Sequence, residues 1–445
     1  MACSGCLGVC VEGQRKTACR ACYIPNKRMA YRGRRVLRSA RFASMTRGAL
    51  SGHFKGVVAK RLKAVEVMPT SSNQHEFNGV RELRSLFGDG RLADCPAHFI
   101  WFGDEGDVFA EHGVMTWYDA RERHPTRSEF RLYFRSNEVM DAASTGDLLL
   151  LARQRDDSLL AVVAPGESTM EGQLLWLFDV PVSDERDLEY RDLTGDDEAL
   201  GFAERYILEE LGIETEEPES ADLDALVEPF GLSFPTTVVF SAFARETLRD
   251  VNPLDGPDAA LLAWMEREEA LFRRLEKRIV ASRLEQGFFS DGEADVDGFV
   301  SFSLSVQNRR KSRVGHALEN HLQEIFDQFG LAYARGACTE GRKKPDFLFP
   351  GPEAYADPEF PSSSLRMLGV KSTCKDRWRQ VLSEAARIDH KHLLTLEPAI
   401  STDQTAEMQA AQLQLVLPES LHSSYKPLQQ HWLMSVSQFI AAVQD

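Results

Sequence analysis

The sequence contains no long hydrophobic run. Apolar stretches such as Leu148–Ala152 are among its longest, and they are far shorter than the roughly 20 residues needed to cross a bilayer. No apolar segment typical of a secretory signal follows the first residues. We therefore exclude membrane-spanning and exported proteins and expect a cytoplasmic globular protein, for which 43% hydrophobic and 27% charged residues are ordinary values.

Cysteine is scarce after residue 22. Cys95, Cys338 and Cys374 are scattered, as is typical of a reduced cytoplasmic protein rather than a disulfide-stabilised one.

The first 44 residues differ from the remainder. Cys3-x-x-Cys6 and Cys19-x-x-Cys22 have the paired spacing of a zinc site. However, no apolar periodicity surrounds them, and Arg-rich sequence follows. This segment is therefore interpreted as a disordered basic leader, or as upstream sequence translated from an incorrect start with Met45 as the true start. Zinc binding stays open as the alternative.

Positive charge is also in short supply, since the net charge is −16, which by itself argues against a nucleic-acid partner. The charges are unevenly distributed, however. Residues 184–228 contain 18 acidic and 3 basic residues, whereas the first 65 residues contain 15 Lys or Arg and one acid. Because a DNA phosphate responds to the local field rather than to the total charge, DNA binding is not excluded.

The chain of 445 residues is long enough for two or three domains. Residues 45–180 are predicted to be a β-rich sandwich or barrel, because short apolar runs alternate with Gly, Asp and Ser. Residues 181–228 are predicted to be an acidic linker that buries little, with some helix around Ala203–Leu211. The strands expected in the β-rich domain are His98–Phe102, Arg131–Phe134, Leu148–Ala152, Leu159–Ala164 and Leu174–Phe178.

From residue 229 to residue 445 the pattern changes to that of an α/β domain, because apolar residues recur at helical spacing between short apolar strands. The expected helices are Leu261–Ile279, Ser312–Phe329, Asp376–Ile388 and one near Trp432–Val443, and the expected strands are Phe347–Phe349, Met367–Val370 and Leu393–Leu396.

Pro345-Asp346 precedes one predicted strand, and Lys371 ends another. This is the skeleton of a nuclease core in which carboxylates hold Mg²⁺ against a phosphate and a lysine stabilises or deprotonates the attacking water. Alone, the pair is a weak signal, because short patterns of common residues recur by chance. It is also incomplete, since Gly369 stands where such cores usually carry an acid two residues before the lysine.

A second carboxylate can come from the helix predicted after Lys371. Glu384 lies 13 residues further on, and a helix that begins just after the lysine strand places it beside Asp346. Glu319, on the preceding predicted helix, offers another carboxylate. The polar face of the later helix carries residues at i, i+3, i+7 and i+10 spacing, namely Arg377, Gln380, Glu384 and Arg387.

Three longer segments make the pattern specific. Ser305–Arg313 reads SVQNRRKSR, Thr339–Pro350 reads TEGRKKPDFLFP, and Leu365–Gln380 reads LRMLGVKSTCKDRWRQ. They resemble the catalytic domain of the EcoRII family of type II restriction endonucleases, a branch of the PD-(D/E)xK superfamily with a migrated acid. The resemblance is nearly continuous from about residue 305 to 397 and weaker from about 230 and toward the end.

The resemblance implies an α/β restriction-endonuclease-like domain over residues 229–445 that cleaves double-stranded DNA with Mg²⁺ at a short palindromic site related to CCWGG and leaves 5′-phosphates. A palindromic target calls for a two-fold homodimer, and a cognate DNA methyltransferase is the implied functional partner. Asp346 and Glu384 are the implied metal ligands and, with Lys371, the catalytic core. The remaining implied active-site residues are Glu319, as an additional acid, Tyr355 and Arg377.

DNA contacts are also implied. Arg309 and Arg310 lie in the first matching segment and are predicted to contact DNA. The family's pocket for a flipped base does not transfer, because the matching register gives Met265 and Glu269. The segment that reads the outer C·G pairs corresponds to Lys375, Asp376 and Arg377, where Lys or Arg donates to guanine and Asp accepts from cytosine.

The β-rich region more loosely resembles the family's N-terminal effector domain, a DNA-binding pseudobarrel. The shared features are Asn73–Gly79, which contains His75, and Arg121–Arg131. A solvated basic strand is the simpler reading of the second segment. The residues predicted to contact DNA in this region are His75, Arg121, Arg123, Arg127 and Arg131.

Two other functions stay open from the sequence. One is a DNA-binding regulator with an inactive nuclease domain, against which the intact Asp346, Lys371 and Glu384 argue. The other is a nuclease that depends on modified bases and uses the β-rich domain as their reader.

Overall fold

The computed structural model describes residues 49–67, 75–103, 107–182, 188–215, 221–290, 293–374 and 377–445. The chain divides into residues 1–45 and 46–445, and the described residues all belong to the second unit. Within the described ranges, no helix is both long and apolar enough to cross a membrane. The predicted site residues that lie outside these ranges are Lys375 and Asp376, together with Cys3, Cys6, Cys19 and Cys22 of the zinc motif.

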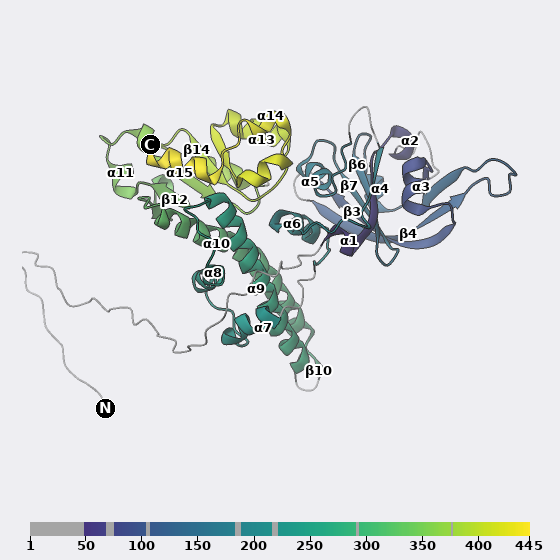
Figure 1. The fold of residues 1–445 in the computed structure, drawn as a ribbon, viewed down its shortest axis with the longest axis horizontal. Helices are drawn as coiled ribbons and strands as arrows, with labels where there is room; N and C mark the ends of the chain where they lie inside the picture. Colours follow the sequence, from purple (N-terminus) through teal and green to yellow (C-terminus); the bar gives the residue numbers. More distant parts are fainter. Residues whose placement is uncertain are drawn as a thin grey trace, which may run out of the picture. The chain divides into compact units, whose positions relative to one another are not determined.

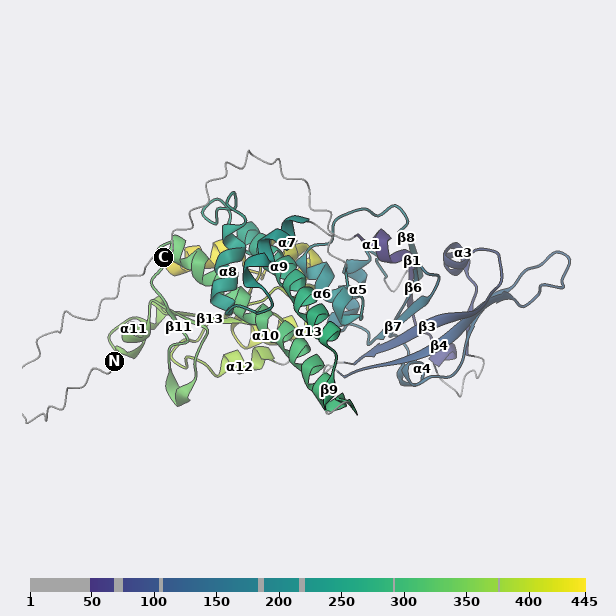
Figure 2. The same cartoon turned by 90° about the horizontal axis from the view of Figure 1, so that it is seen from below.

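The β-rich half is built on one eight-stranded sheet with the order β2-β5-β4-β3-β7-β6-β1-β8 (Figures 1 and 2). Neighbouring strands are antiparallel except β3 and β7, which are parallel. Among the described strands, β2 and β8 form the two edges, so the sheet is an open, curled half-barrel rather than the closed barrel or sandwich expected. The strands are β1 (Phe54–Arg61), β2 (Glu76–Asn78), β3 (Leu92–Phe102), β4 (Val108–Asp119), β5 (Phe130–Phe134), β6 (Leu148–Gln154), β7 (Leu159–Ala164) and β8 (Leu188–Asp192).

Both faces of β6 are buried. Leu148 and Leu150 belong to a core on one face of the sheet, and Leu149 and Leu151 belong to a second core on the other face. A strand that is covered on both faces needs apolar side chains at successive positions, which explains its unbroken leucine run. The short helices of this half are α1 (Leu50–His53), α2 (Ala64–Val67), α3 (Arg81–Phe87) and α4 (Glu138–Ala142).

The prediction of a strand over Leu174–Phe178 was wrong, because these residues belong to helix α5 (Thr169–Leu177) and its C-cap. Ser168 caps the helix by accepting a hydrogen bond from the backbone N–H of Glu171. Because the cap starts the helix at Thr169, the apolar run Leu174–Phe178 falls in its last turn instead of forming a strand.

The segment that composition assigns to a linker is folded where it is described. Residues 188–192 form β8, which pairs with β1, and α6 (Phe202–Glu210) lies where a helix was expected. Ile207 and Leu208 pack into the core of the β-rich half, whereas Phe202 packs into the core of the C-terminal half. Apolar residues between the acids therefore anchor a segment whose net charge predicted little burial.

Two long helices, α9 (Pro257–Gln286) and α10 (Val296–Gln328), form a hairpin whose tip carries the short strands β9 (Phe289–Ser290) and β10 (Glu293–Ala294) (Figure 1). Asp295 accepts a hydrogen bond from Gly298 N and so caps α10 well before the expected start at Ser312. The smaller helices that pack beside this hairpin are α7 (Ala221–Val227), the 3₁₀ helix η1 (Glu228–Phe230) and α8 (Thr237–Glu246).

The C-terminal half contains a five-stranded sheet with the order β11-β12-β13-β14-β15. The first three strands are antiparallel, and β13, β14 and β15 are parallel. The strands are β11 (Ala334–Arg335), β12 (Phe347–Phe349), β13 (Arg366–Val370), β14 (Lys391–Leu394) and β15 (Leu413–Val416). The helices are α11 (Pro352–Ala356), α12 (Trp378–Leu382), α13 (Thr402–Ala410), α14 (Pro427–Gln430) and α15 (Val436–Gln444), with 3₁₀ helices η2 (Glu340–Arg342), η3 (Ser362–Ser364) and η5 (Glu419–Ser424).

These contacts predict where a stable C-terminal fragment begins. Residues 198–445 retain Phe202, which is buried against the C-terminal core, and Leu223 and Val227, which are buried against α9. A fragment of residues 229–445 lacks them and exposes the apolar surface that they cover. We expect the longer fragment to unfold at a clearly higher temperature in circular dichroism melts; equal melting temperatures would show that α6 and α7 add nothing to this core.

Candidate active site

Asp346 directly precedes β12 and lies next to the end of β13. Its Oδ2 accepts hydrogen bonds from Val370 N at 2.6 Å and from Lys371 Nζ at 3.0 Å. The antiparallel register, in which Phe347 is opposite Leu368, brings the start of one strand to the end of the other. The predicted carboxylate and lysine therefore meet at one edge of the sheet.

Gly369 leaves no room for the acid that nuclease cores of this kind usually carry at this position. A Cβ atom there would lie 2.8 Å from Cγ2 and 3.0 Å from Cγ1 of Val381, which packs from α12 onto the strand. An acidic side chain at this position would displace the helix from the sheet. The site thus needs its second carboxylate from elsewhere.

Glu384, the predicted second carboxylate, lies in a turn and not in a helix. A helix was expected over Asp376–Ile388, but the helix α12 ends at Leu382. Ala385, three residues later, has a φ of +46°, which is not helical. The expected polar face is therefore interrupted, and Glu384 and Arg387 follow the helix. The charges of Asp346 and Lys371 both act on the Glu384 carboxyl, so its proximity to Asp346 stays a prediction that the electrostatics support.

The electrostatic environment of Glu384 is unusual. Burial, and then the charge of Asp346, raise the pKa of its carboxyl to about 7, although Lys371 acts in the opposite direction. Its Oε2 is buried and has no hydrogen-bond partner among the described residues. Two mutually repelling carboxylates, one with an unsatisfied oxygen, fit a divalent cation with oxygen ligands.

The described residues contain no cluster of three or more His, Cys, Asp or Glu side chains suited to a metal. Asp346 and Glu384 are thus a two-carboxylate set, which fits Mg²⁺ because that ion usually retains several waters and binds few protein ligands.

Tyr355 lies near the same turn. Its hydroxyl donates to Glu340 Oε2 at 2.6 Å and accepts from Arg387 N at 3.2 Å. Burial, and then the bond to Glu340, raise the pKa of Tyr355 to about 12. The Arg387 guanidinium also donates to the carbonyls of Ala354, Tyr355 and Phe360, and so ties α11 to the turn that contains Glu384.

Glu340 was not recognised as a site residue from the sequence. Its carboxylate also accepts a hydrogen bond from Ala386 N at 3.4 Å. The only signal for it was its position in the matching segment Thr339–Pro350, which says nothing about its contact with Tyr355.

The remaining predicted active-site residues are Glu319 and Arg377. Glu319 Oε2 accepts from Arg335 Nη2 at 2.7 Å and from Nε at 3.1 Å, so this carboxylate is already neutralised by a cation. Arg377 is exposed and precedes α12 as its N-cap, with its backbone N–H donating to Cys374 O at 2.8 Å.

The predicted DNA contacts of the C-terminal half have different environments. Arg310 pairs with Glu276 at 2.6 Å and with Glu214 at 3.0 Å, so its charge is compensated within the chain. Arg309 lies over the ring of Phe234, 4.3 Å from its centre, and is exposed.

In the β-rich half, Arg123 and Arg127 are exposed in the loop between β4 and β5. Arg121 pairs with Glu129 at 2.5 Å. Arg131 also pairs with Glu129, and its guanidinium lies 3.8 Å from Glu76. His75 packs edge-on against Phe134, with the two ring centres 5.8 Å apart. Thus the loop tip, rather than its base, presents positive charge to solvent.

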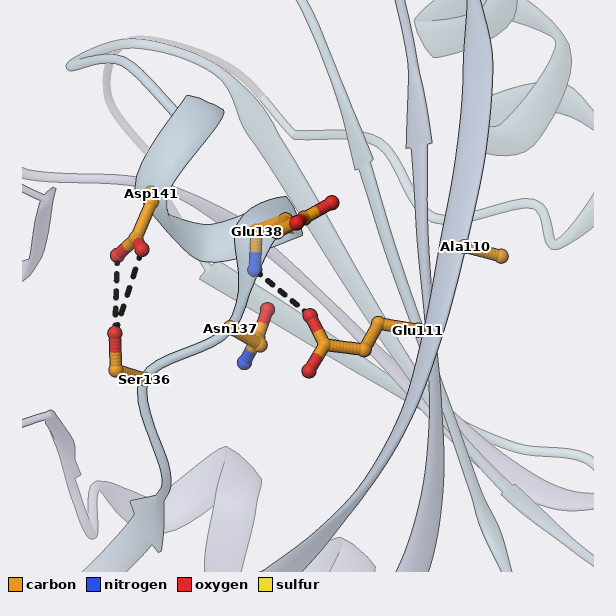
Figure 3. A pocket seen from close by; sticks show the side chains of 6 residues that line it. All are labelled: Ala110, Glu111, Ser136, Asn137, Glu138 and Asp141. Carbon is orange, nitrogen blue, oxygen red and sulfur yellow. Dashed lines mark hydrogen bonds between the residues drawn. The ribbon is translucent and has the colours of Figure 1, made fainter.

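A shallow pocket in the β-rich half contains none of the predicted site residues (Figure 3). Glu138 N donates to Glu111 Oε2 at 2.8 Å, and Ser136 donates to Asp141. Its three carboxylates disfavour a phosphate ligand. The candidate active site is therefore the edge of the C-terminal sheet.

The raised pKa of Glu384 predicts a pH-dependent stability. The folded state holds the proton more tightly than the unfolded chain, so the stabilisation is present at low pH and lost as the pH rises through about 7. In EDTA, Glu384→Gln should be more stable than the wild type at pH 8, and the difference should shrink as the pH falls toward about 4.5. Urea denaturation measures this, and the exposed Glu285→Gln variant controls for the loss of one charge. A difference that is constant between pH 5 and 8 contradicts the assignment.

The C-terminal half matches a known family and a known enzyme. The family model for the EcoRII C terminal domain matches residues 272–440. Over 217 residues the chain is 47% identical to the type II restriction enzyme EcoRII of Escherichia coli, a match that covers 48% of this chain and 52% of that protein. The chain thus spans about half the length of this relative.

Two solved structures are more distant matches. A complex of the restriction endonuclease PspGI with substrate DNA is 16% identical, with a TM-score of 0.40 over 47% of this chain and 92% of the other. A metal-depleted complex of Ecl18kI with uncleaved DNA is 18% identical, with a TM-score of 0.38 over 50% of this chain and 82% of the other. The family match and the identity to EcoRII agree: over residues 272–440 this chain is similar to the EcoRII C terminal domain.

Proposed function

We propose that this chain is a type II restriction endonuclease that cleaves both strands of DNA, with Mg²⁺, at a short palindromic site related to CCWGG. The observation that carries the proposal is the meeting of Asp346, Lys371 and Glu384 at one sheet edge, with a buried Glu384 oxygen that has no partner among the described residues. The 47% identity to EcoRII over 217 residues supports the same reaction.

Asp346 and Glu384 would hold the Mg²⁺ ion, which supplies Lewis-acid polarisation of the phosphate when bound. Lys371 lies 3.0 Å from Asp346, and its ammonium would stabilise the negative charge that develops on the phosphoryl oxygens. The oxygen of water forms a bond to phosphorus, the bond to the 3′-oxygen breaks, and the water proton ends on that oxygen. The products are a 5′-phosphate and a 3′-hydroxyl.

Glu340, Tyr355 and Arg387 support this arrangement without touching the reacting atoms. Their hydrogen bonds join α11 to the turn that follows Glu384. Because transition-state stabilisation depends on sub-ångström placement of charges, a fixed turn is a requirement for the buried carboxylate to act.

The partners follow from the same proposal. Double-stranded DNA is the substrate, and a palindromic site calls for a homodimer, with a cognate methyltransferase to protect host DNA. We further propose that residues 45–180 form a second DNA-binding domain. The exposed Arg123 and Arg127 in the loop between β4 and β5 support that role.

The two alternative functions make different demands. A regulator with an inactive nuclease does not require the ion pair between Lys371 and Asp346 or a buried acid beside it. A nuclease that depends on modified bases would cut methylated DNA in preference to unmethylated DNA. Digesting both substrates and sequencing the ends of the products separates these functions and gives the recognition site.

Asp346→Ala tests the metal site. The change removes a metal ligand and the partner of Lys371, but no base contact. We expect cleavage of site-containing plasmid DNA to be abolished while binding of the same DNA persists in a gel-shift assay. Residual cleavage within tenfold of the wild type would rule out Asp346 as a required ligand.

A comparison of Glu384→Gln with Glu319→Gln tests which of these two acids is the second metal ligand. Glu384→Gln should lower the single-turnover rate by orders of magnitude, because the buried oxygen available to a metal is lost. Glu319→Gln should have a smaller effect, since Arg335 already occupies that carboxylate. Rates are measured at several Mg²⁺ concentrations; a dead Glu319→Gln enzyme beside a fully active Glu384→Gln enzyme would reverse the assignment.

A further inference from the structure

A buried carboxylate that the mechanism does not use lies behind the active-site edge. Glu397 follows β14 and is only 5% exposed. The parallel pairing of β13 with β14 places the segments after these strands side by side. Lys371 N donates to Leu394 O at 2.9 Å, and Thr395 Oγ1 donates to Ser372 O at 3.5 Å. The segment after the catalytic lysine therefore runs along the residues that lead to Glu397.

Glu397 fixes the backbone of that segment at Cys374. The fully buried Cys374 donates its N–H to Glu397 Oε2. The carbonyl of Cys374 accepts from Arg377 N at 2.8 Å. A chain of two hydrogen bonds thus connects Glu397 to the residue that caps α12 and is predicted to contact both the active site and the outer base pairs.

The other oxygen of the same carboxylate faces helix α5 of the β-rich half. Gln173 Nε2 lies 3.4 Å from Glu397 Oε1 and 3.3 Å from Pro398 O, and the Gln173 side chain is 1% exposed. The contact is tight, because a Cβ at Gly172 would lie 2.9 Å from Ala399 O. Both oxygens of Glu397 therefore accept hydrogen bonds from donors, one on each side.

The backbone around Glu397 is itself restrained. Glu397 N donates to Thr395 Oγ1 at 3.2 Å, and the buried hydroxyl of Tyr425 donates to Glu397 O at 2.7 Å. The carboxylate thus extends from a fixed point, so its hydrogen bonds set the position of Cys374 rather than follow it.

We propose that Glu397 is a positioning residue for Arg377, acting through Cys374, and that Gln173 of α5 holds the Glu397 carboxylate in place. The proposal rests on the proposed function, since it concerns the fidelity of that reaction. It needs a carboxylate specifically: a carboxylate accepts at both oxygens, whereas an amide accepts at one and donates at the other. The β-rich half is thereby connected to the orientation of a predicted DNA-contacting residue.

The test uses the full chain as wild type, Glu397→Gln, Gln173→Glu and the double variant. The substrates are a duplex with one CCWGG site and the same duplex with one outer C·G pair changed to T·A. In Glu397→Gln, the new NH₂ group faces either the backbone N–H of Cys374 or the side-chain NH₂ of Gln173. Two donors then face each other, so one hydrogen bond is lost. We expect the kcat/KM ratio between the two duplexes to fall roughly tenfold or more. In the double variant, the amide at position 397 donates to the carboxylate at position 173, and most of the ratio should return.

Thr169→Val is the matched control. Thr169 joins α5 to the same surface through Ser401 N at 3.0 Å and Gln404 Oε1 at 3.1 Å, without touching Glu397. It should lower stability but leave the ratio unchanged. Gln173→Ala removes the donor to Glu397 and to Pro398 O but keeps the Glu397 carboxylate. It takes the place of Glu397→Gln if that variant does not fold, and it should lower the ratio in the same direction.

Binding of both duplexes without metal is measured in parallel, so that the result does not depend on cleavage. If the wild type cuts neither duplex, the proposed function fails, while the binding ratio still tests Glu397. Ratios of the variants within twofold of the wild type, an equal loss in Thr169→Val, or no discrimination by the wild type in either assay would overturn the positioning role.

Discussion

The pairing of the start of β12 with the end of β13 is the constraint on which the candidate active site depends. It places Asp346 within hydrogen-bond distance of Val370 N and Lys371 Nζ. The same strand end begins the segment that leads to Cys374 and Arg377. The relative positions of the carboxylate and the lysine therefore depend on this register, and a one-residue shift would separate them.

The site concentrates negative charge at a cost that a cation can offset. Partial burial of Glu384, and then the charge of Asp346, raise the pKa of its carboxyl to about 7, and Lys371 acts in the opposite direction. Arg310, by contrast, is paired with Glu276 and Glu214 within the chain. Carboxylates whose charge is only partly compensated, as at Asp346 and Glu384, are typical of a ligand site, whereas fully paired charges such as that of Arg310 are typical of structural ion pairs.

The described parts of the acidic segment between the two halves belong to the folded architecture. β8 completes the edge of the first sheet, and α6 contributes side chains to the cores of both halves. Together with α5, which contacts Glu397 through Gln173, it brings the β-rich half against the residues behind the active site.

The sequence by itself determined much of the result. Unbroken apolar runs predicted β6 and β7, and helical spacing predicted α9 and α10, because local periodicity reflects which faces are buried. The position of Asp346 before one strand and of Lys371 at the end of another also followed from the local sequence, whereas the pairing of these two strands did not. Only the tertiary structure decided the rest. Val381 excluded a side chain at Gly369, Glu384 came to lie in a turn rather than on the expected helix face, and Gln173 came into contact with Glu397. Contacts between different elements decide such outcomes, and they leave no periodic trace in the sequence.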